Sequence, residues 1–148
     1  MKIGIVGCTG RMGKALVEEI LLNDDCELSG GAVRTNSDFV GMDIGSLAGL
    51  DPVGINAGGS LEALFEQSDA VIDFSNPEVS LKCASVAAAQ NKIHVIGTTG
   101  FTLKEKDDLI EFAKKCPIIW SANMSIGVNI LSAITEQVAA ILDDSYDI

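Results

Sequence analysis

Three glycines near the N-terminus have the spacing of a phosphate-binding turn. Gly7, Gly10 and Gly13 follow an apolar run at residues 3–6, and an amphipathic helix pattern begins directly after them. In such a strand–turn–helix unit the first glycine permits a sharp turn, the second lets a pyrophosphate approach the backbone, and the third lets the helix lie close to the strand. The unpartnered N–H groups and the dipole of the helix N-terminus favour an anion there. The pattern therefore predicts a dinucleotide site, although a tight turn without a ligand has the same glycines.

Small or polar residues also follow the other strands that the sequence predicts. These strands cover residues 27–34, 69–74, 92–96 and 117–120. The residues at their ends are Val33, Arg34, Phe74, Ser75, Gly97, Thr98, Thr99, Ser121, Ala122, Asn123 and Met124. Ligands of parallel sheets bind outside the carboxyl ends of the strands, so we expect these residues to face one crevice together with the glycine turn.

Helical patterns alternate with these strands. They cover residues 10–22, 61–67, 77–90, 102–115 and 130–142. Ser60 can cap the second helix, Ser75 or Asn76 can cap the third with Glu78 completing a capping box, and Thr102 with Glu105 predicts a capping box at the fourth. This βαβ alternation predicts an α/β fold: a Rossmann-like, doubly wound and mostly parallel sheet with helices on both faces. Residues 35–59, rich in Gly, Asp, Asn and Ser, predict a long irregular connection with one short strand at 53–55.

The end of the second predicted strand bears on the choice of cofactor. In this fold it meets the adenosine ribose, about twenty residues beyond the glycine turn. An acid there favours NAD, whereas an arginine can pair with the 2′-phosphate of NADP. This chain has Val33 and Arg34 there and no acid. We therefore expect NADPH or NADH as the cofactor, with NADPH bound at least as well, unless Arg34 is only a surface residue.

Composition and charge exclude several classes of partner. The formal net charge of −11 argues against a nucleic-acid surface or an anionic membrane surface. We find no apolar run long enough to span a bilayer and no secretory signal pattern at the N-terminus. We therefore expect a cytoplasmic protein without nucleic-acid or membrane partners.

The cysteines and the histidine do not suggest a catalytic or metal site. Cysteines 8, 26, 83 and 116 are too far apart for a C-x-x-C motif, so we expect free thiols. His94, the only histidine, stands in the apolar run at 93–96, where a satisfied strand residue is the favoured interpretation. No metal ligand and no catalytic residue is predicted.

Four motifs in order resemble one family. VGCTGRMG at 6–13, DFS at 73–75, GTTG at 97–100 and SANMSIGVN at 121–129 are similar to the 4-hydroxy-tetrahydrodipicolinate reductase family, long called dihydrodipicolinate reductase. The resemblance runs from Lys2 to the end of the chain. It implies a nicotinamide-dependent reductase of the diaminopimelate and lysine pathway that delivers hydride to a cyclic unsaturated dicarboxylate, reducing 4-hydroxy-tetrahydrodipicolinate to tetrahydrodipicolinate.

The resemblance also implies roles for matched residues. The glycine turn would hold the pyrophosphate, the GTTG segment would line the nicotinamide side with Thr99 also near the substrate, and residues 121–124 would close the crevice. The implied cofactor-binding residues are Gly7, Cys8, Thr9, Gly10, Arg11, Met12, Gly13, Arg34, Phe74, Gly97, Thr98, Thr99, Ser121, Ala122, Asn123 and Met124.

The chain departs from the family pattern in two respects. Family members often carry an acid followed by arginine after the second strand, and here Val33 takes the place of the acid. The catalytic His-His and Lys segment and the homotetramer interface of the family belong to a second domain, which has no counterpart in these residues. We therefore expect a nucleotide-binding domain at 1–122, a connecting helix and the start of a truncated substrate and oligomerisation domain at 123–148, and a fragment that is inactive by itself.

Two other functions remain open from the sequence. A standalone NAD(P)-sensing regulatory module would also lack catalytic residues. Another Rossmann dehydrogenase, such as one acting on aspartate semialdehyde or homoserine, would need its own catalytic groups, for example a reactive loop cysteine. Cys8, Cys83 and Cys116 are poorly placed for that role, because the first lies in the glycine turn and the others on predicted helices.

Overall fold

The computed structural model describes residues 1–142 and 146, and its core is a single parallel sheet. The elements are β1 (Lys2–Val6), α1 (Arg11–Leu21), β2 (Glu27–Ala32), α2 (Ile44–Ala48), β3 (Ala57–Gly58), α3 (Leu61–Gln67), β4 (Ala70–Asp73), α4 (Pro77–Gln90), β5 (Ile93–Ile96), α5 (Leu103–Ala113), β6 (Ile118–Trp120) and α6 (Ile126–Ile141). Six strands lie in the order β3-β2-β1-β4-β5-β6, and every neighbouring pair is parallel. The predicted Rossmann-like fold is confirmed.

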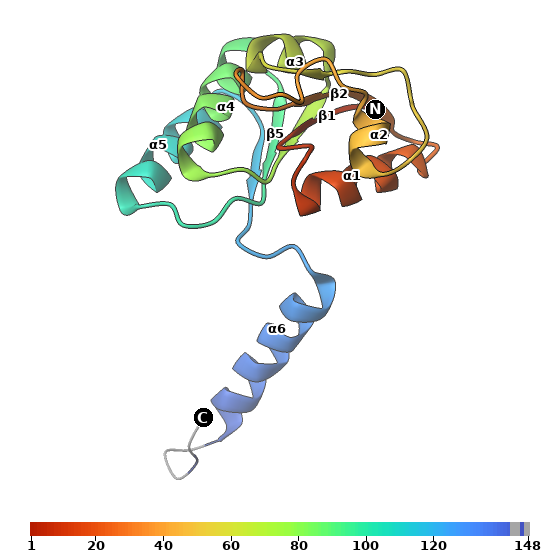
Figure 1. Cartoon of the computed structure of the whole chain (residues 1–148). Helices are drawn as coiled ribbons and strands as arrows, with labels where there is room; N and C mark the ends of the chain where they lie inside the picture. The colour runs from red at the N-terminus through yellow and green to blue at the C-terminus, as the bar shows by residue number, and fades with distance from the viewer. Residues whose placement is uncertain (143–145, 147–148) are drawn as a thin grey trace.

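Helices cover both faces of this sheet (Figure 1). On one face α1 and α2 enclose a core that includes Ile5, Val17 and Ile44, all fully buried. On the other face α3, α4 and α5 enclose two further clusters, which include Phe65 and Ile96. The chain builds the sheet outward from β1 to β3, then returns to the middle at β4. The carboxyl ends of β1 and β4 therefore form the topological switch point, where ligands of this fold bind.

The last described helix, α6, extends away from the sheet (Figure 1). Ser125 caps it by accepting a hydrogen bond from the N–H of Val128, so α6 begins four residues earlier than the pattern at 130–142 predicts. No residue of α6 is buried, and apolar side chains such as Ile126 and Leu131 are more than half exposed. None of the helices in the described part of the chain has the length and apolar character needed to cross a membrane.

The connection at 35–59 differs most from the prediction. Asp43 caps the unpredicted helix α2 and also accepts hydrogen bonds from the N–H groups of Val53 and Gly54. Because those N–H groups are taken by a carboxylate, the predicted strand at 53–55 is wrong, and the residues that join the sheet are Ala57–Gly58.

The predicted end of β2 shifts, whereas the predicted bounds of α4 are confirmed. β2 ends at Ala32 rather than at Arg34, which leaves Arg34 beyond the sheet. α4 spans Pro77–Gln90 as predicted, and of the two expected capping residues it is Asn76 that accepts the hydrogen bond from the N–H of Val79. Glu78 does not complete a capping box there. Glu78 instead forms an ion pair with Lys82 at 2.7 Å. The capping box of Thr102 and Glu105 at the start of α5 is present as predicted.

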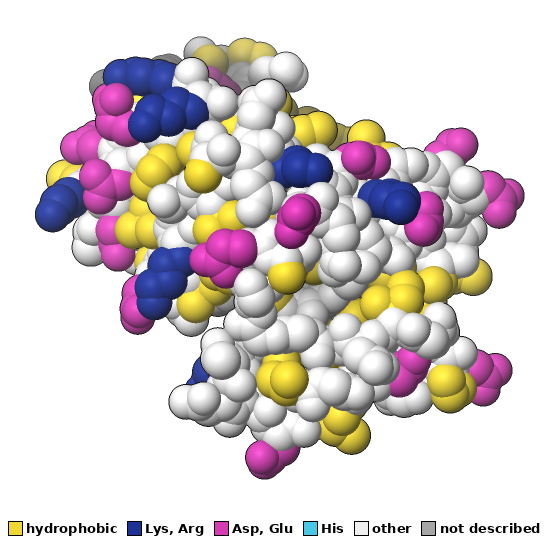
Figure 2. All heavy atoms as spheres, turned by 90° about the horizontal axis from the view of Figure 1, so that it is seen from above, with side chains coloured by type: hydrophobic (Ala, Val, Ile, Leu, Met, Phe, Trp, Pro, Cys, Tyr) yellow, Lys and Arg dark blue, Asp and Glu magenta, His cyan; other side chains and the backbone are white. Residues whose placement is uncertain are grey.

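The surface charge is mixed on the face that Figure 2 shows. Acidic and basic side chains are scattered there among uncharged side chains, backbone and small apolar areas. On this face the carboxylates lie as separate groups interspersed with basic side chains rather than in one block.

Candidate dinucleotide site

The glycine turn leads directly from β1 into α1. Gly10 is the N-cap residue of α1, and no side chain accepts a hydrogen bond from the first N–H groups of this helix. The first turn also contains no acidic residue. An uncapped helix N-terminus offers backbone N–H donors and a partial positive charge, so a phosphate group is a suitable partner.

Two of the glycines are required by the geometry of the turn. Gly7 has a φ of +77°, a conformation that side chains other than glycine rarely adopt. A Cβ atom on Gly13 would lie 2.7 Å from the Cα atom of Cys8 and closer still to the carbonyl oxygen of Gly7. Gly13 therefore lets α1 start against the end of β1, as the fingerprint predicts.

A cleft of about 280 Å³ lies where this turn meets the ends of β4 and β5. Its lining combines the start of α1, the exit of β4 and the exit of β5. The lining residues are Gly10, Arg11, Met12, Phe74, Ser75, Gly97, Thr98 and Thr99. The sequence analysis predicts that residues from these three segments share one crevice. The structure brings them together at the topological switch point.

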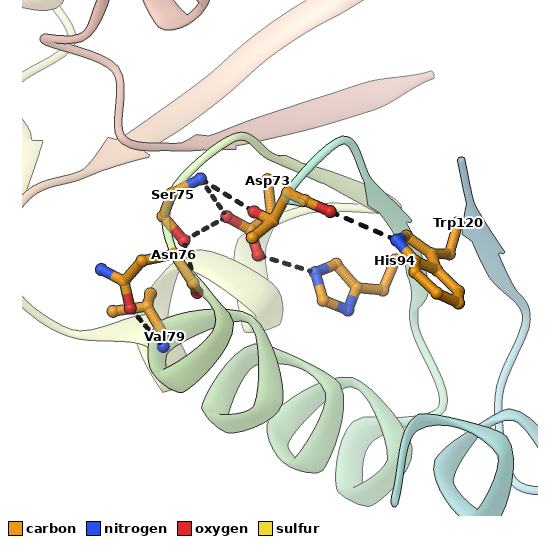
Figure 3. Close-up of polar contacts among 7 residues, drawn as sticks. Asp73, Ser75, Asn76, Val79, His94 and Trp120 are labelled. Carbon is orange, nitrogen blue, oxygen red and sulfur yellow. Dashed lines mark hydrogen bonds and ion pairs between the residues drawn. The ribbon is translucent and has the colours of Figure 1, made fainter. Parts of the chain in front are cut away.

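A polar network holds the β4 and β5 exits beside each other (Figure 3). The Asp73 carboxylate accepts hydrogen bonds from the N–H of Ser75 at 2.9 Å and from its hydroxyl at 2.5 Å. The same N–H also donates to the hydroxyl of Thr98 at 3.1 Å. Trp120, at the end of β6, donates from its indole to the backbone carbonyl of Thr98 at 3.2 Å. Three neighbouring strand ends are thus fixed relative to one another.

Phe74 and Gly97 pack against each other at the cleft. A Cβ atom on Gly97 would lie 2.6 Å from Cδ1 of Phe74 and closer to two other ring carbons. The absence of a side chain at Gly97 therefore makes room for the Phe74 ring, which forms part of the cleft wall.

The other residues expected at the site lie around the cleft rather than on its lining. The Cys8 side chain is fully buried, and burial raises the pKa of its thiol, so only the backbone of Cys8 is available to a ligand. Gly13 is also buried, and Gly7 and Thr9 are half-buried in the turn. Arg34 is exposed beyond β2 and forms no ion pair within residues 1–142. Residues 121–124 form the mostly exposed link to α6, held by a hydrogen bond from the hydroxyl of Ser121 to the carbonyl of Asn123.

His94 differs from the satisfied strand residue that the sequence predicts. It is fully buried in β5, and neither ring nitrogen has a hydrogen-bond partner within the described structure. Its Nε2 atom lies 3.5 Å from Oδ2 of Asp73. No sequence pattern could show this pairing, because it depends on the register of β4 against β5.

A third group lies near this pair. One ligand atom each from Asp73, Cys83 and His94 falls within 4.8 Å of the others. The pKa of the Cys83 thiol is raised strongly, first by burial and then by the charge of Asp73. A thiol that keeps its proton is a poor metal ligand, because the thiolate is the form that binds metals. Cys83 is therefore a protonated thiol in the metal-free protein, and a metal bound here would have to displace that proton.

Comparison with known proteins agrees with this architecture. Residues 1–124 match the family model described as "Dihydrodipicolinate reductase, N-terminus". The chain is 41% identical to a 4-hydroxy-tetrahydrodipicolinate reductase of Wolbachia pipientis subsp. Culex pipiens, covering 100% of this chain and 56% of that protein. It is 42% identical to the protein of that name from Hahella chejuensis, covering 99% of this chain and 55% of the relative. The chain thus spans about half the length of the curated relatives it matches.

Solved structures share the fold. A dipicolinate-bound dihydrodipicolinate reductase from Paenisporosarcina sp. TG-14 superposes with a TM-score of 0.60 at 23% identity, covering 76% of this chain and 43% of that one. A biliverdin reductase from Synechocystis sp. PCC 6803, in complex with biliverdin and NADP⁺, superposes with a TM-score of 0.61 at 19% identity, covering 80% of this chain and 37% of that one. The family match over residues 1–124 covers the whole sheet and the cleft, and on that evidence the chain belongs to the dihydrodipicolinate reductase family, as its N-terminal part.

Proposed function

We propose that this chain is the cofactor-binding part of a 4-hydroxy-tetrahydrodipicolinate reductase. The observation that carries the proposal is the cleft at the switch point, where the uncapped N-terminus of α1 meets the hydroxyl-bearing exit of β5. The cleft suits an elongated ligand with an anionic centre. A standalone NAD(P)-sensing module has no support among the relatives described above, which are named as reductases.

Different segments around the cleft would bind different parts of the cofactor and the substrate. The backbone of residues 7–13 would hold the pyrophosphate at the start of α1. Phe74, Gly97 and Thr98 would form the wall of the nicotinamide pocket, with Thr99 facing the dicarboxylate substrate. Residues 121–124 would close the cleft from the side of β6. A bound reduced nicotinamide supplies the hydride for the reaction, and the residues named here position it.

The cofactor proposed is NADPH, bound at least as well as NADH. Val33 offers no acceptor for the hydroxyls of an adenosine ribose, and Arg34 is an exposed cation next to it. A guanidinium can pair with a 2′-phosphate in bidentate fashion. Such a charge-assisted contact is worth roughly 1.5–3 kcal/mol, which corresponds to about a tenfold to hundredfold difference in affinity.

Reduction also needs a group that supplies a proton, and the cleft lining has no side chain suited to this near neutral pH. We therefore propose that residues 1–148 bind the cofactor without reducing the substrate. We propose further that the whole reductase is a cytoplasmic homotetramer, in which a second domain grips the dicarboxylate. NADPH oxidation by residues 1–148 with freshly generated substrate tests the first of these statements, and measurable turnover would contradict it.

Calorimetric titration of the chain with NADPH and NADH tests the binding function. We expect a stoichiometric site for both, with NADPH at least as tight. Arg34→Ala should lower the ratio of NADPH to NADH affinity by about tenfold or more. Lys115→Ala, which removes an exposed cation after α5, is the matched control and should leave the ratio unchanged. No binding of either nucleotide would refute the proposed function, whereas an unchanged ratio in Arg34→Ala would refute only the role of Arg34.

A further inference from the structure

Asp73 and His94 form a buried polar pair beside the cleft. His94 lies opposite Val71 in the register of β4 and β5, and Asp73 is two residues beyond Val71. Alternate residues of a strand point to the same face, so both side chains point into the layer that α4 covers. Both are completely buried, and Nε2 of His94 is 3.5 Å from Oδ2 of Asp73 (Figure 3).

The atoms of Asp73 and His94 that face each other have no hydrogen-bond partner in the described structure. Oδ2 of Asp73 and both ring nitrogens of His94 are buried without a hydrogen bond. Such groups are costly to bury unless they are paired. A shift of about 0.6 Å would bring these two atoms from 3.5 Å to the usual distance for an N–H···O bond, about 2.9 Å. The rings of His94 and Phe65 also pack in a T-shaped arrangement, with 5.7 Å between their centroids, which limits the other positions open to the imidazole.

The second oxygen of Asp73 extends the contact to the cleft. Oδ1 accepts both hydrogen bonds from Ser75, and the N–H of Ser75 also reaches the hydroxyl of Thr98. Ser75 and Thr98 both line the cleft. A carboxylate that is free to rotate would hold Ser75 poorly, so whatever fixes Oδ2 also fixes the shape of the cleft wall.

We propose that His94 is a positioning residue for nucleotide binding. Its imidazole N–H orients the carboxylate of Asp73, and Asp73 in turn holds Ser75 and the exit of β4 against Thr98. The inference rests on the proposed function, in that the bound ligand is the dinucleotide. The role of His94 is indirect, because the residue is completely buried and does not line the cleft.

The test compares two variants of the 148-residue chain by calorimetric titration with NADPH. His94→Leu keeps an apolar side chain of similar size but removes the donor. His94→Gln keeps an N–H donor near the place of Nε2. We expect His94→Leu to weaken NADPH binding by about tenfold and His94→Gln to recover most of this loss. Thermal unfolding of each variant measures the stability cost separately.

A double-mutant cycle with Ser75→Ala tests whether the effect passes through Ser75. If His94 acts through that residue, the double variant should bind NADPH about as weakly as the worse of the two single variants. If the loss of NADPH affinity in the double variant equalled the product of the fold-losses in the two single variants, the two residues would act independently and the proposal would be overturned. It would also be overturned if His94→Leu bound NADPH as the wild type does, whatever its melting temperature, or if His94→Gln bound no better than His94→Leu.

Nitrogen NMR of the wild-type chain gives a test that needs no His94 variant. His94 is the only histidine, so its ring signals can be assigned directly. We expect a proton on Nε2, with a signal that shifts when NADPH is added. An imidazole with a bare Nε2 would overturn the proposal even if His94→Leu failed to fold. Failure of the wild-type chain to bind NADPH or NADH would refute the proposed function and this role together, whereas normal wild-type binding with an unaffected His94→Leu would refute this role alone.

Discussion

Replacing Gly13 with alanine should disrupt the start of α1 more than any nearby glycine substitution. The new Cβ atom would lie 2.7 Å from Cα of Cys8 and 2.9 Å from its carbonyl carbon, and closer still to the Gly7 oxygen. All three neighbours are backbone atoms, so no side-chain rotation can relieve the contact. The first turn of α1 would have to move away from β1 by roughly an ångström, since carbon atoms pack at about 3.5–4.0 Å.

The magnitude follows from two opposing effects. Overpacking of this kind costs about 3 kcal/mol of unfolding free energy, the upper part of the usual range. The higher helix propensity of alanine relative to glycine offsets about 1 kcal/mol of this loss in unfolding free energy. The net loss of about 2 kcal/mol should lower the melting temperature of a chain of this size by about 6 °C. Because the displaced N–H groups of α1 would form the phosphate site, NADPH affinity should fall as well.

Two matched alanine substitutions provide the controls. At Gly10 a Cβ atom would meet only the Gly7 oxygen, at 3.3 Å, and at Gly127 it would meet nothing within 4 Å. Thermal unfolding followed by circular dichroism, with NADPH titration of each folded variant, should rank Gly13→Ala lowest in stability and Gly127→Ala highest. A melting temperature of Gly13→Ala equal to that of Gly127→Ala would refute the close-approach reasoning.

Three further predictions concern the cleft wall, acid stability and thiol reactivity. Gly97→Ala should displace the Phe74 ring and weaken NADPH binding by about tenfold, and the double variant Gly97→Ala, Phe74→Ala should bind more tightly than Gly97→Ala if the ring is the obstacle. The pKa of Asp43 lies below its usual value of 3.8, mainly because its carboxylate accepts backbone hydrogen bonds. The ionised carboxylate therefore stabilises the folded chain at pH values above 3.8, and this stabilisation is lost as the pH falls through the lower pKa of the folded state. The stability gap between wild type and Asp43→Asn in urea titrations should therefore narrow from pH 6 towards pH 3, and a constant gap would contradict this. Cys26, which is partly exposed, should react with iodoacetamide in the native chain well before the buried Cys8, and equal rates by mass spectrometry would contradict the burial of Cys8.

Local signals explain most of what could be predicted about the fold. Ser60 caps α3 and Thr102 with Glu105 caps α5, as their spacing indicates, because capping bonds join residues only three positions apart. The short sequence separation of such local signals also explains why the strand predicted at 53–55 is wrong. Asp43 does cap α2 locally, but its bonds to Val53 and Gly54 span ten or eleven residues, and no local pattern shows that those N–H groups are unavailable to a strand.

The sequence by itself determined the glycine turn, the alternation of strands and helices, and the family. It also placed the small and polar residues after the strands, because the carboxyl end of a strand can be read from a short apolar run. The relations between strands were decided only in the tertiary structure. The pairing of Asp73 with His94, the contact of Trp120 with Thr98 and the packing of the Phe74 ring on Gly97 each join residues more than twenty positions apart. They depend on strand order and register, which arise when the sheet assembles around its buried core rather than from any neighbouring residues.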